Sequence, residues 1–123
     1  MGVVSPELMA AAFADRFNAG DSEGFSQLFT DEAIFTYDGA DKARGRRQIE
    51  GALAGFMQAG LSFRGQNVTT IVAGDTALTR FQWELIDAVG AVVASGISAE
   101  VQKRGPDGLW RLVIDDSGGG SRS

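Results

Sequence analysis

The hydrophobic positions of the chain change their spacing near residue 60. Before that point, apolar side chains recur three or four residues apart, which is the period of an amphipathic helix. Residues that typically begin or end helices divide this half of the chain. A serine–proline–glutamate sequence begins the first helix, glycines end the helices, and an aspartate precedes a short second helix. The pattern predicts helices at 5–20, 21–29 and 46–59, and a strand at 33–37.

After residue 60 the period becomes two, which is typical of β-strands. Segments 61–72, 76–87, 91–103 and 109–115 are rich in β-branched and aromatic residues, and short glycine-containing turns connect them. Long strands joined by short turns favour an antiparallel meander, and helices gathered before the sheet indicate an α+β fold with helices on one sheet face. We expect one domain, residues 1–116, followed by a flexible glycine- and serine-rich tail, residues 117–123.

The alternation within the strands predicts which side chains face the helices. The apolar set comprises Ala77, Phe81, Trp83, Leu85, Val93, Ile97, Ala99, Val101, Trp110, Leu112 and Ile114. The opposite face is mixed and offers charged residues for cross-strand pairing, namely Arg80, Glu84, Glu100 and Arg111. Such a face is either exposed to solvent or the surface of a dimer.

The composition narrows the chemistry that the chain can carry out. The 123 residues have a formal net charge of −5 and no basic stripe, so neither nucleic acid nor an anionic membrane is an expected partner. Cysteine and histidine are both absent, which excludes disulfides, thiol catalysis, the Ser-His-Asp triad and the usual zinc sites. We expect no metal and no cofactor. With no signal-peptide pattern and no apolar run of about 18 residues, the expected location is the cytoplasm.

Three stretches resemble the NTF2-like superfamily, which includes SnoaL-like and ketosteroid-isomerase-like proteins. Phe17 to Phe35 (FNAGDSEGFSQLFTDEAIF) is similar to its opening: an N-x-G-D helix break, a short helix, and an acidic step into the first strand. Arg44 to Phe56 (RGRRQIEGALAGF) resembles the next helix, and Gly96 to Asp116 (GISAEVQKRGPDGLWRLVIDD) the final hairpin of the DUF4440-type branch. The resemblance implies a cone: a curved antiparallel sheet wrapped around N-terminal helices, open to a pocket at one end and commonly dimeric through the outer sheet face.

Members of this superfamily catalyse isomerisation, cyclisation, dehydration or epoxide hydrolysis, or only bind a ligand, so function has to be argued from the site. The isomerase chemistry uses a carboxylate base together with a tyrosine and a protonated aspartic acid as hydrogen-bond donors. The resemblance places these three roles at Phe13 (donor), Tyr37 (base) and Ala99 (acid). None of the three is the required residue type, so ketosteroid isomerisation by that residue set is not expected.

Tyr37 and Asp116 are the candidate catalytic residues. If Phe35 and Tyr37 face the cavity, the Tyr37 hydroxyl either donates to a ligand oxygen or belongs to a core tyrosine with a satisfied hydroxyl. Asp38 then points away and forms part of a turn. By parity with Trp110, Asp116 faces the apolar side, where desolvation would raise its pKa. The alternative for Asp116 is a strand-end aspartate that caps the following turn.

Aromatic side chains are expected both in the core and around the pocket. The residues expected to contact a ligand are Phe13, Phe17, Phe35, Phe56, Trp83, Ala99 and Trp110. Two hypotheses about function stay open. In the first, a homodimer binds a small, largely apolar molecule and performs histidine-free acid–base chemistry on it. In the second, the domain is a non-catalytic module for ligand binding or protein interaction.

Overall fold

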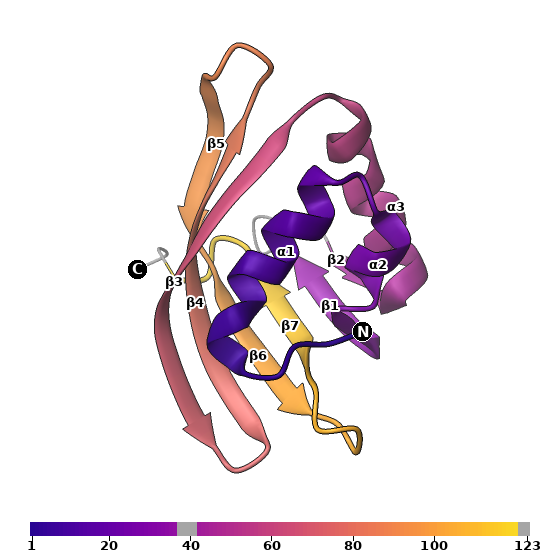
Figure 1. The fold of residues 1–123 in the computed structure, drawn as a ribbon, viewed down its shortest axis with the longest axis vertical. Helices are drawn as coiled ribbons and strands as arrows, with labels where there is room; N and C mark the ends of the chain where they lie inside the picture. Colours follow the sequence, from indigo (N-terminus) through magenta and orange to yellow (C-terminus); the bar gives the residue numbers. More distant parts are fainter. Residues whose placement is uncertain (37–41, 121–123) are drawn as a thin grey trace.

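A curved sheet lies against a group of helices on its concave side (Figure 1). The structure, a computed structural model, describes residues 1–36 and 42–120, so Tyr37 and Asp38 lie outside the described residues. The elements in chain order are η1 (Pro6–Leu8), α1 (Met9–Asn18), α2 (Ser22–Ser26), β1 (Phe29–Thr36), β2 (Lys42–Arg44), α3 (Gly45–Gln58), β3 (Ser62–Ala73), β4 (Thr76–Ile86), β5 (Val92–Ile97), β6 (Ala99–Arg104) and β7 (Trp110–Asp116). The predicted α+β fold is confirmed.

Local capping explains where α2 begins and where α1 and α3 end. The Asp21 carboxylate accepts a hydrogen bond from the Gly24 N–H at 2.9 Å and thereby caps α2. Gly20 and Gly60 follow α1 and α3 with φ angles of 68° and 78°. This left-handed conformation suits glycine because it has no Cβ, and it ends each helix at the residue predicted from the sequence.

Aromatic contacts and one amide side chain hold α1 against the sheet. The ring centroid of Phe13 lies 4.5 Å from that of Phe25 and 4.7 Å from that of Phe63. Asn18, in the N-x-G-D break, donates to the Phe63 carbonyl at 2.8 Å and accepts from the Phe63 N–H at 2.6 Å. The Asn18 side chain therefore pairs with β3 as a neighbouring strand residue would, which fixes the end of α1 over the start of this strand.

The sheet is more complex than an antiparallel meander. Within the described residues its strands follow the order β2-β1-β7-β6-β4-β3, with β5 paired to β4. The pairs along this path are antiparallel except for β1 and β7, which run parallel. The expectation of a purely antiparallel sheet is therefore wrong at this pair. Strand periodicity alone cannot show it, because β1 and β7 are joined only through α3 and the intervening hairpins.

The segment predicted as one strand at 91–103 bends at Ser98. β5 pairs with the C-terminal part of β4, whereas β6 pairs with its N-terminal part. At the bend, the Ser98 N–H donates to the Phe81 carbonyl at 2.9 Å, and the Ser98 Oγ accepts from the Phe81 N–H at 3.1 Å. The hydroxyl therefore replaces a backbone acceptor where the strand changes direction.

The two faces of β6 are the reverse of the prediction. Glu100 and Gln102 are buried on the concave face, whereas Ala99 and Val101 are half-buried on the outer face. The register of the preceding hairpin is the cause: Arg104 pairs with Trp110, and directly paired residues share a face. Counting back in twos from Arg104 places the polar residues of β6 inside.

A β-bulge reverses the parity of the last strand. Val101 pairs with Ile114 while Gln102 pairs with Leu112, so Val113 is an additional residue in β7. One additional residue moves every later side chain to the opposite face. Asp115 is therefore the buried residue, and the expectation that Asp116 faces the apolar side is wrong.

The chain continues to make hydrogen bonds beyond the predicted domain end at residue 116. The Ser117 N–H donates to the Thr36 carbonyl at 3.1 Å, and the Gly120 N–H donates to the Ile97 carbonyl at 2.9 Å. Residues 117–120 thus form a turn against the sheet rather than a separate tail, and residues 121–123 lie outside the described part. Among the described helices, none is both long and apolar enough to cross a membrane.

Candidate functional site

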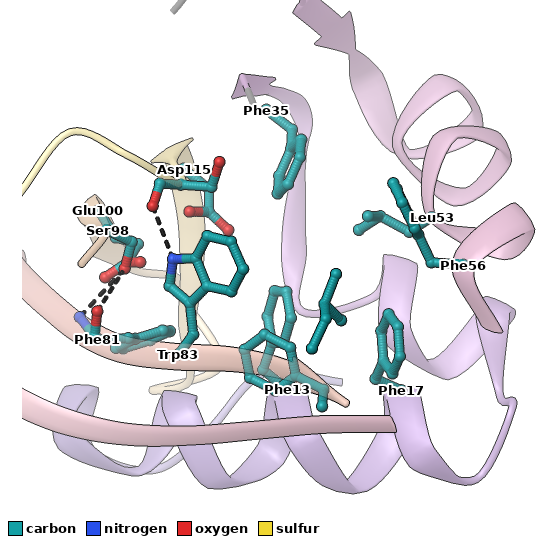
Figure 2. A pocket seen from close by; sticks show the side chains of 13 residues that line it. Phe13, Phe17, Phe35, Leu53, Phe56, Phe81, Trp83, Ser98, Glu100 and Asp115 are labelled. Carbon is teal, nitrogen blue, oxygen red and sulfur yellow. Dashed lines mark hydrogen bonds between the residues drawn. The ribbon is translucent and has the colours of Figure 1, made fainter. Parts of the chain in front are cut away.

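A pocket opens between the helices and the concave face of the sheet. It has a volume of about 70 Å³, and aromatic side chains from α1, α3, β1, β3 and β4 gather around it (Figure 2). Its lining consists of Phe13, Phe17, Phe35, Leu53, Phe56, Phe63, Phe81, Trp83, Leu85, Ser98, Glu100, Asp115 and Ser117. The wall is thus apolar except for two carboxyl groups and two serines.

Five of the seven predicted ligand-contacting residues line this pocket, namely Phe13, Phe17, Phe35, Phe56 and Trp83. Ala99 does not, because the reversed faces of β6 place it on the outer side, where it pairs with Asp116. Trp110 does not line it either. Its backbone bonds to Val3, and the Arg104 guanidinium lies 5.5 Å from its ring centroid.

Trp83 forms a fixed wall of the pocket. Its indole Nε1 donates to the Ser117 carbonyl at 2.7 Å, a bond drawn as a dashed line from Trp83 in Figure 2. Its ring stacks on Phe63 with centroids 6.4 Å apart. Gly96, which faces Trp83 on β5, leaves room for the indole: a Cβ there would lie 3.0 Å from the ring. These three contacts together restrict the indole to one position.

The polar part of the wall comes from paired residues on β6 and β7. Glu100 and Asp115 lie opposite each other in the strand register, and their exposed fractions are 1% and 3%. Asp116 does not line the pocket, and its Oδ1 accepts a hydrogen bond from the Thr36 hydroxyl at 3.0 Å. Of the two predicted catalytic residues, Asp116 thus faces away from the pocket, and Tyr37 lies outside the described residues.

Burial raises the pKa values of both carboxyl groups. Desolvation, together with the negative charge of Asp115, raises the pKa of Glu100 to about 10, although the hydroxyls of Ser98 and Thr79 act in the opposite direction. Desolvation also raises the pKa of Asp115 to about 7, against the opposing influence of the neighbouring Glu100 carboxyl. Near neutral pH, Glu100 therefore carries a proton while Asp115 is close to its titration point.

A protonated carboxyl beside a titrating one can act as an acid–base pair. Asp115 can accept a proton from a bound molecule, since a base works best when its pKa lies near the working pH. Glu100, as a neutral acid, can donate a hydrogen bond to an oxygen that gains negative charge. Among the described residues, no group of three or more acidic side chains is placed to hold a metal ion.

Glu100 and Asp115 are absent from the predicted site residues because strand parity placed both on the outer face. The hairpin register around the turn at 105–108 is the signal that would have found Glu100, because it pairs Arg104 with Trp110. No comparable local signal marks the bulge at Val113, which brings Asp115 inside. The orientation of both carboxyl groups toward the pocket thus depends on how the strands pair.

The chain matches the family of SnoaL-like domains over residues 10–112. It belongs to this family. The SnoaL-like assignment agrees with the curved, unclosed sheet and with the resemblance to the NTF2-like superfamily. The narrower placement in the DUF4440-type branch stays a prediction. A search of curated protein sequences finds no match.

Solved structures share the fold of this SnoaL-like protein. A domain of unknown function with a cystatin-like fold from Nostoc punctiforme is 18% identical, with a TM-score of 0.80 over 91% of this chain and 73% of that one. An NTF2-like protein from Novosphingobium aromaticivorans is 24% identical, with a TM-score of 0.74 over 89% and 76%. A ketosteroid isomerase-like protein from Erwinia carotovora is 18% identical, with a TM-score of 0.69 over 89% of each chain. At these identities the likeness supports the fold alone.

Proposed function

We propose that this SnoaL-like protein binds a small, largely apolar molecule in its pocket and performs acid–base chemistry on it with Glu100 and Asp115. The observation that carries the proposal is the placement of two buried carboxyl groups, without histidine, in an otherwise aromatic cavity. Strongly perturbed carboxyls in a cleft are typical of catalytic sites. Tyr37 stays a candidate for a further hydrogen-bond donor.

The pocket wall sets the chemical class of the ligand. Aromatic rings cover most of the surface, so a ligand with large charged groups would lose its hydration without compensation. The volume of about 70 Å³ exceeds the roughly 10–15 Å³ that one water needs, so a small organic molecule fits. The neutral Glu100 carboxyl offers a hydrogen bond to an acceptor such as a carbonyl or epoxide oxygen.

The reaction class follows from the two protonation states. Asp115 in its ionised form removes a proton from a carbon beside a carbonyl, while Glu100 stabilises the oxyanion that develops. The same pair supports a proton shift, loss of water, or opening of an epoxide. This arrangement differs from the isomerase residue set as the resemblance places it, because Phe13 stands at the position of the donor and Ala99, at the position of the acid, faces the outer side.

A ligand panel tests the proposal. Thermal unfolding is recorded with matched cyclic ketones, epoxides, hydrocarbons and carboxylates, and we expect the neutral oxygen-containing compounds to raise Tm most. The hits are then incubated in deuterated water, where exchange of protons beside the carbonyl reports proton transfer. Binding without exchange or turnover supports the non-catalytic module instead. If hydrocarbons and ketones raise Tm equally, Glu100 does not contact the ligand and the proposal fails.

We also propose that the protein is a homodimer through its outer sheet face. An apolar row crosses five strands there, because Ile71 pairs with Leu78, Leu78 with Val101, Val101 with Ile114, and Ile114 with Ile34. Ile71 and Ile114 are 58% and 42% exposed. A second copy of the chain would remove this row from water, which is a strong driving force for association.

The cytoplasmic location expected from the sequence also stays a prediction.

Light scattering coupled to size-exclusion chromatography measures the dimer. We expect the unaltered protein at micromolar concentration to have twice the 12.9 kDa mass of one chain, and Ile114→Arg to have the monomer mass. Val89→Arg is the matched control, because Val89 is 87% exposed in the β4–β5 turn, away from the row. A monomeric unaltered protein, or an Ile114→Arg variant that stays dimeric, would contradict this interface.

A further inference from the structure

A chain of buried hydrogen bonds leads from η1 to Glu100. The Gln102 Nε2 lies 3.1 Å from the Pro6 carbonyl oxygen and 3.0 Å from the Thr79 Oγ1. The Thr79 Oγ1 in turn lies 3.1 Å from the Glu100 Oε1. Thr79 and Gln102 have no exposed surface and do not line the pocket. We call Gln102, Thr79 and Glu100 the buried relay.

The direction of each hydrogen bond in the buried relay is determined by its first member. The Pro6 carbonyl oxygen can only accept, so the Gln102 atom beside it must be the amide nitrogen. The same nitrogen therefore donates to Thr79. The single hydroxyl proton of Thr79 is then left for the Glu100 Oε1, since no other acceptor lies near it among the described residues.

This direction decides which oxygen of Glu100 carries the proton. Oε1 accepts from Thr79, so the proton of the neutral acid sits on Oε2. Oε2 is buried and makes no hydrogen bond of normal geometry within the described residues. An ionised Glu100 would leave negative charge on Oε2 without a donor, next to the Asp115 carboxyl and aromatic rings. A proton on Oε2 resolves this and leaves an O–H donor at the pocket wall.

We propose that Thr79 and Gln102 are positioning residues that hold the proton of Glu100 on Oε2. From there the O–H group can donate a hydrogen bond to Asp115 or to the acceptor oxygen of a neutral ligand. The ligand part of this inference rests on the proposed function, whereas the proton placement does not. Neither residue touches the ligand, and their effect passes through Glu100. Ser98 is the rival donor to Glu100, although its hydroxyl also lies 3.5 Å from the Phe81 carbonyl oxygen.

Infrared difference spectroscopy tests the proton placement. A protonated carboxylic acid has a C=O stretch that a carboxylate lacks, and the band lost in Glu100→Gln at neutral pH identifies Glu100. We expect Thr79→Val to move this band to higher wavenumber, because Oε1 loses its donor, and Thr79→Ser to restore it. Ser98→Ala removes the rival donor and should leave the band in place, because the Ser98 hydroxyl bonds to the Phe81 backbone. Should Thr79→Val fail to fold, Thr79→Ala removes the same donor with a smaller side chain.

Binding of two probes separates the two parts of the inference. Cyclohexanone should bind Thr79→Val up to about tenfold more weakly than the unaltered protein, a loss typical of one misdirected hydrogen bond, while cyclohexane should bind both alike. The placement is overturned if Glu100→Gln removes no band, if Thr79→Val leaves the band unmoved, or if Ser98→Ala moves it. If the band behaves as expected but neither probe binds, the proposed function fails and the proton placement stands.

Discussion

The double variant Glu100→Gln/Asp115→Asn is expected to be more stable than the unaltered protein at pH 8. Both carboxyls have pKa values raised in the folded state, chiefly by desolvation, to about 10 for Glu100 and about 7 for Asp115. The folded protein therefore holds protons that the unfolded chain has released, and the free energy of unfolding falls as pH rises. This contribution is complete below about pH 4 and is lost as pH rises through 7 and toward 10.

The size of this effect follows from the shift at one residue. The pKa of Asp115 rises from 3.8 to about 7, which corresponds to roughly 4 kcal/mol at 1.4 kcal/mol per pKa unit. Glu100 interacts with Asp115, so the two contributions do not add. Neutral amides of the same shape remove this penalty, and we expect the double variant to gain several kcal/mol at pH 8.

Urea unfolding between pH 4 and pH 9 measures the difference. The unaltered protein should lose stability steadily across this range, whereas the double variant should lose much less. Asp116→Asn is the control because Asp116 adjoins Asp115 without lining the pocket, and its charge has only a secondary effect on the Asp115 pKa. Parallel pH curves for the unaltered protein and the double variant would show that the pair is not desolvated as the structure indicates.

Asp115→Asn is expected to reduce turnover of a substrate about 10²–10⁴-fold, the usual contribution of a general base. The asparagine side chain keeps the shape of the residue but cannot accept a proton, so binding should change little while kcat falls. The unaltered protein should gain activity as pH rises toward 7, because Asp115 must be ionised to act as the proposed base. The apparent pKa values in that profile belong to the pair rather than to either residue.

The neighbouring residue again supplies the control for turnover. Asp116→Asn changes the adjacent carboxylate, which bonds to Thr36 outside the pocket, and should leave kcat within about threefold. Any substrate found in the ligand panel serves for the comparison. Equal losses in both variants would mean that Asp115 acts through structure. Full activity in Asp115→Asn would remove it from the mechanism.

Several features of the fold were predictable because they depend on neighbouring residues. Asp21 caps α2 through a residue three positions away, and Gly20 and Gly60 end helices by their own backbone conformation. The five predicted residues that line the pocket lie on elements whose period was correctly identified. Strand periodicity identified Trp83 as inward-facing because the register shifts beside β4 place the additional residue in β3 or β5, so the alternation of β4 itself is uninterrupted.

The errors concern side chains whose orientation depends on distant strands. Strict alternation along β7 assigns Asp116 to the inner face because it does not allow for a bulge. The bulge at Val113 is visible only in the pairing of β7 with β6. In β6 the apolar residues, such as Val101, face outward and the polar residues face the helices. Hydrophobic alternation therefore predicts the orientation of this strand the wrong way round. The proposed homodimer would account for that inversion, because a second copy of the chain would cover the apolar residues of the outer face.

The sequence by itself determined the α+β class, the order of most elements, the aromatic character of the pocket and the absence of histidine and thiol chemistry. These depend on composition and on contacts within a few residues along the chain. The tertiary structure alone decided that Glu100 and Asp115, rather than Asp116, meet inside the pocket. The reason is physical: a side chain in a strand has two possible directions, and a bulge or a hairpin register formed with another strand selects between them.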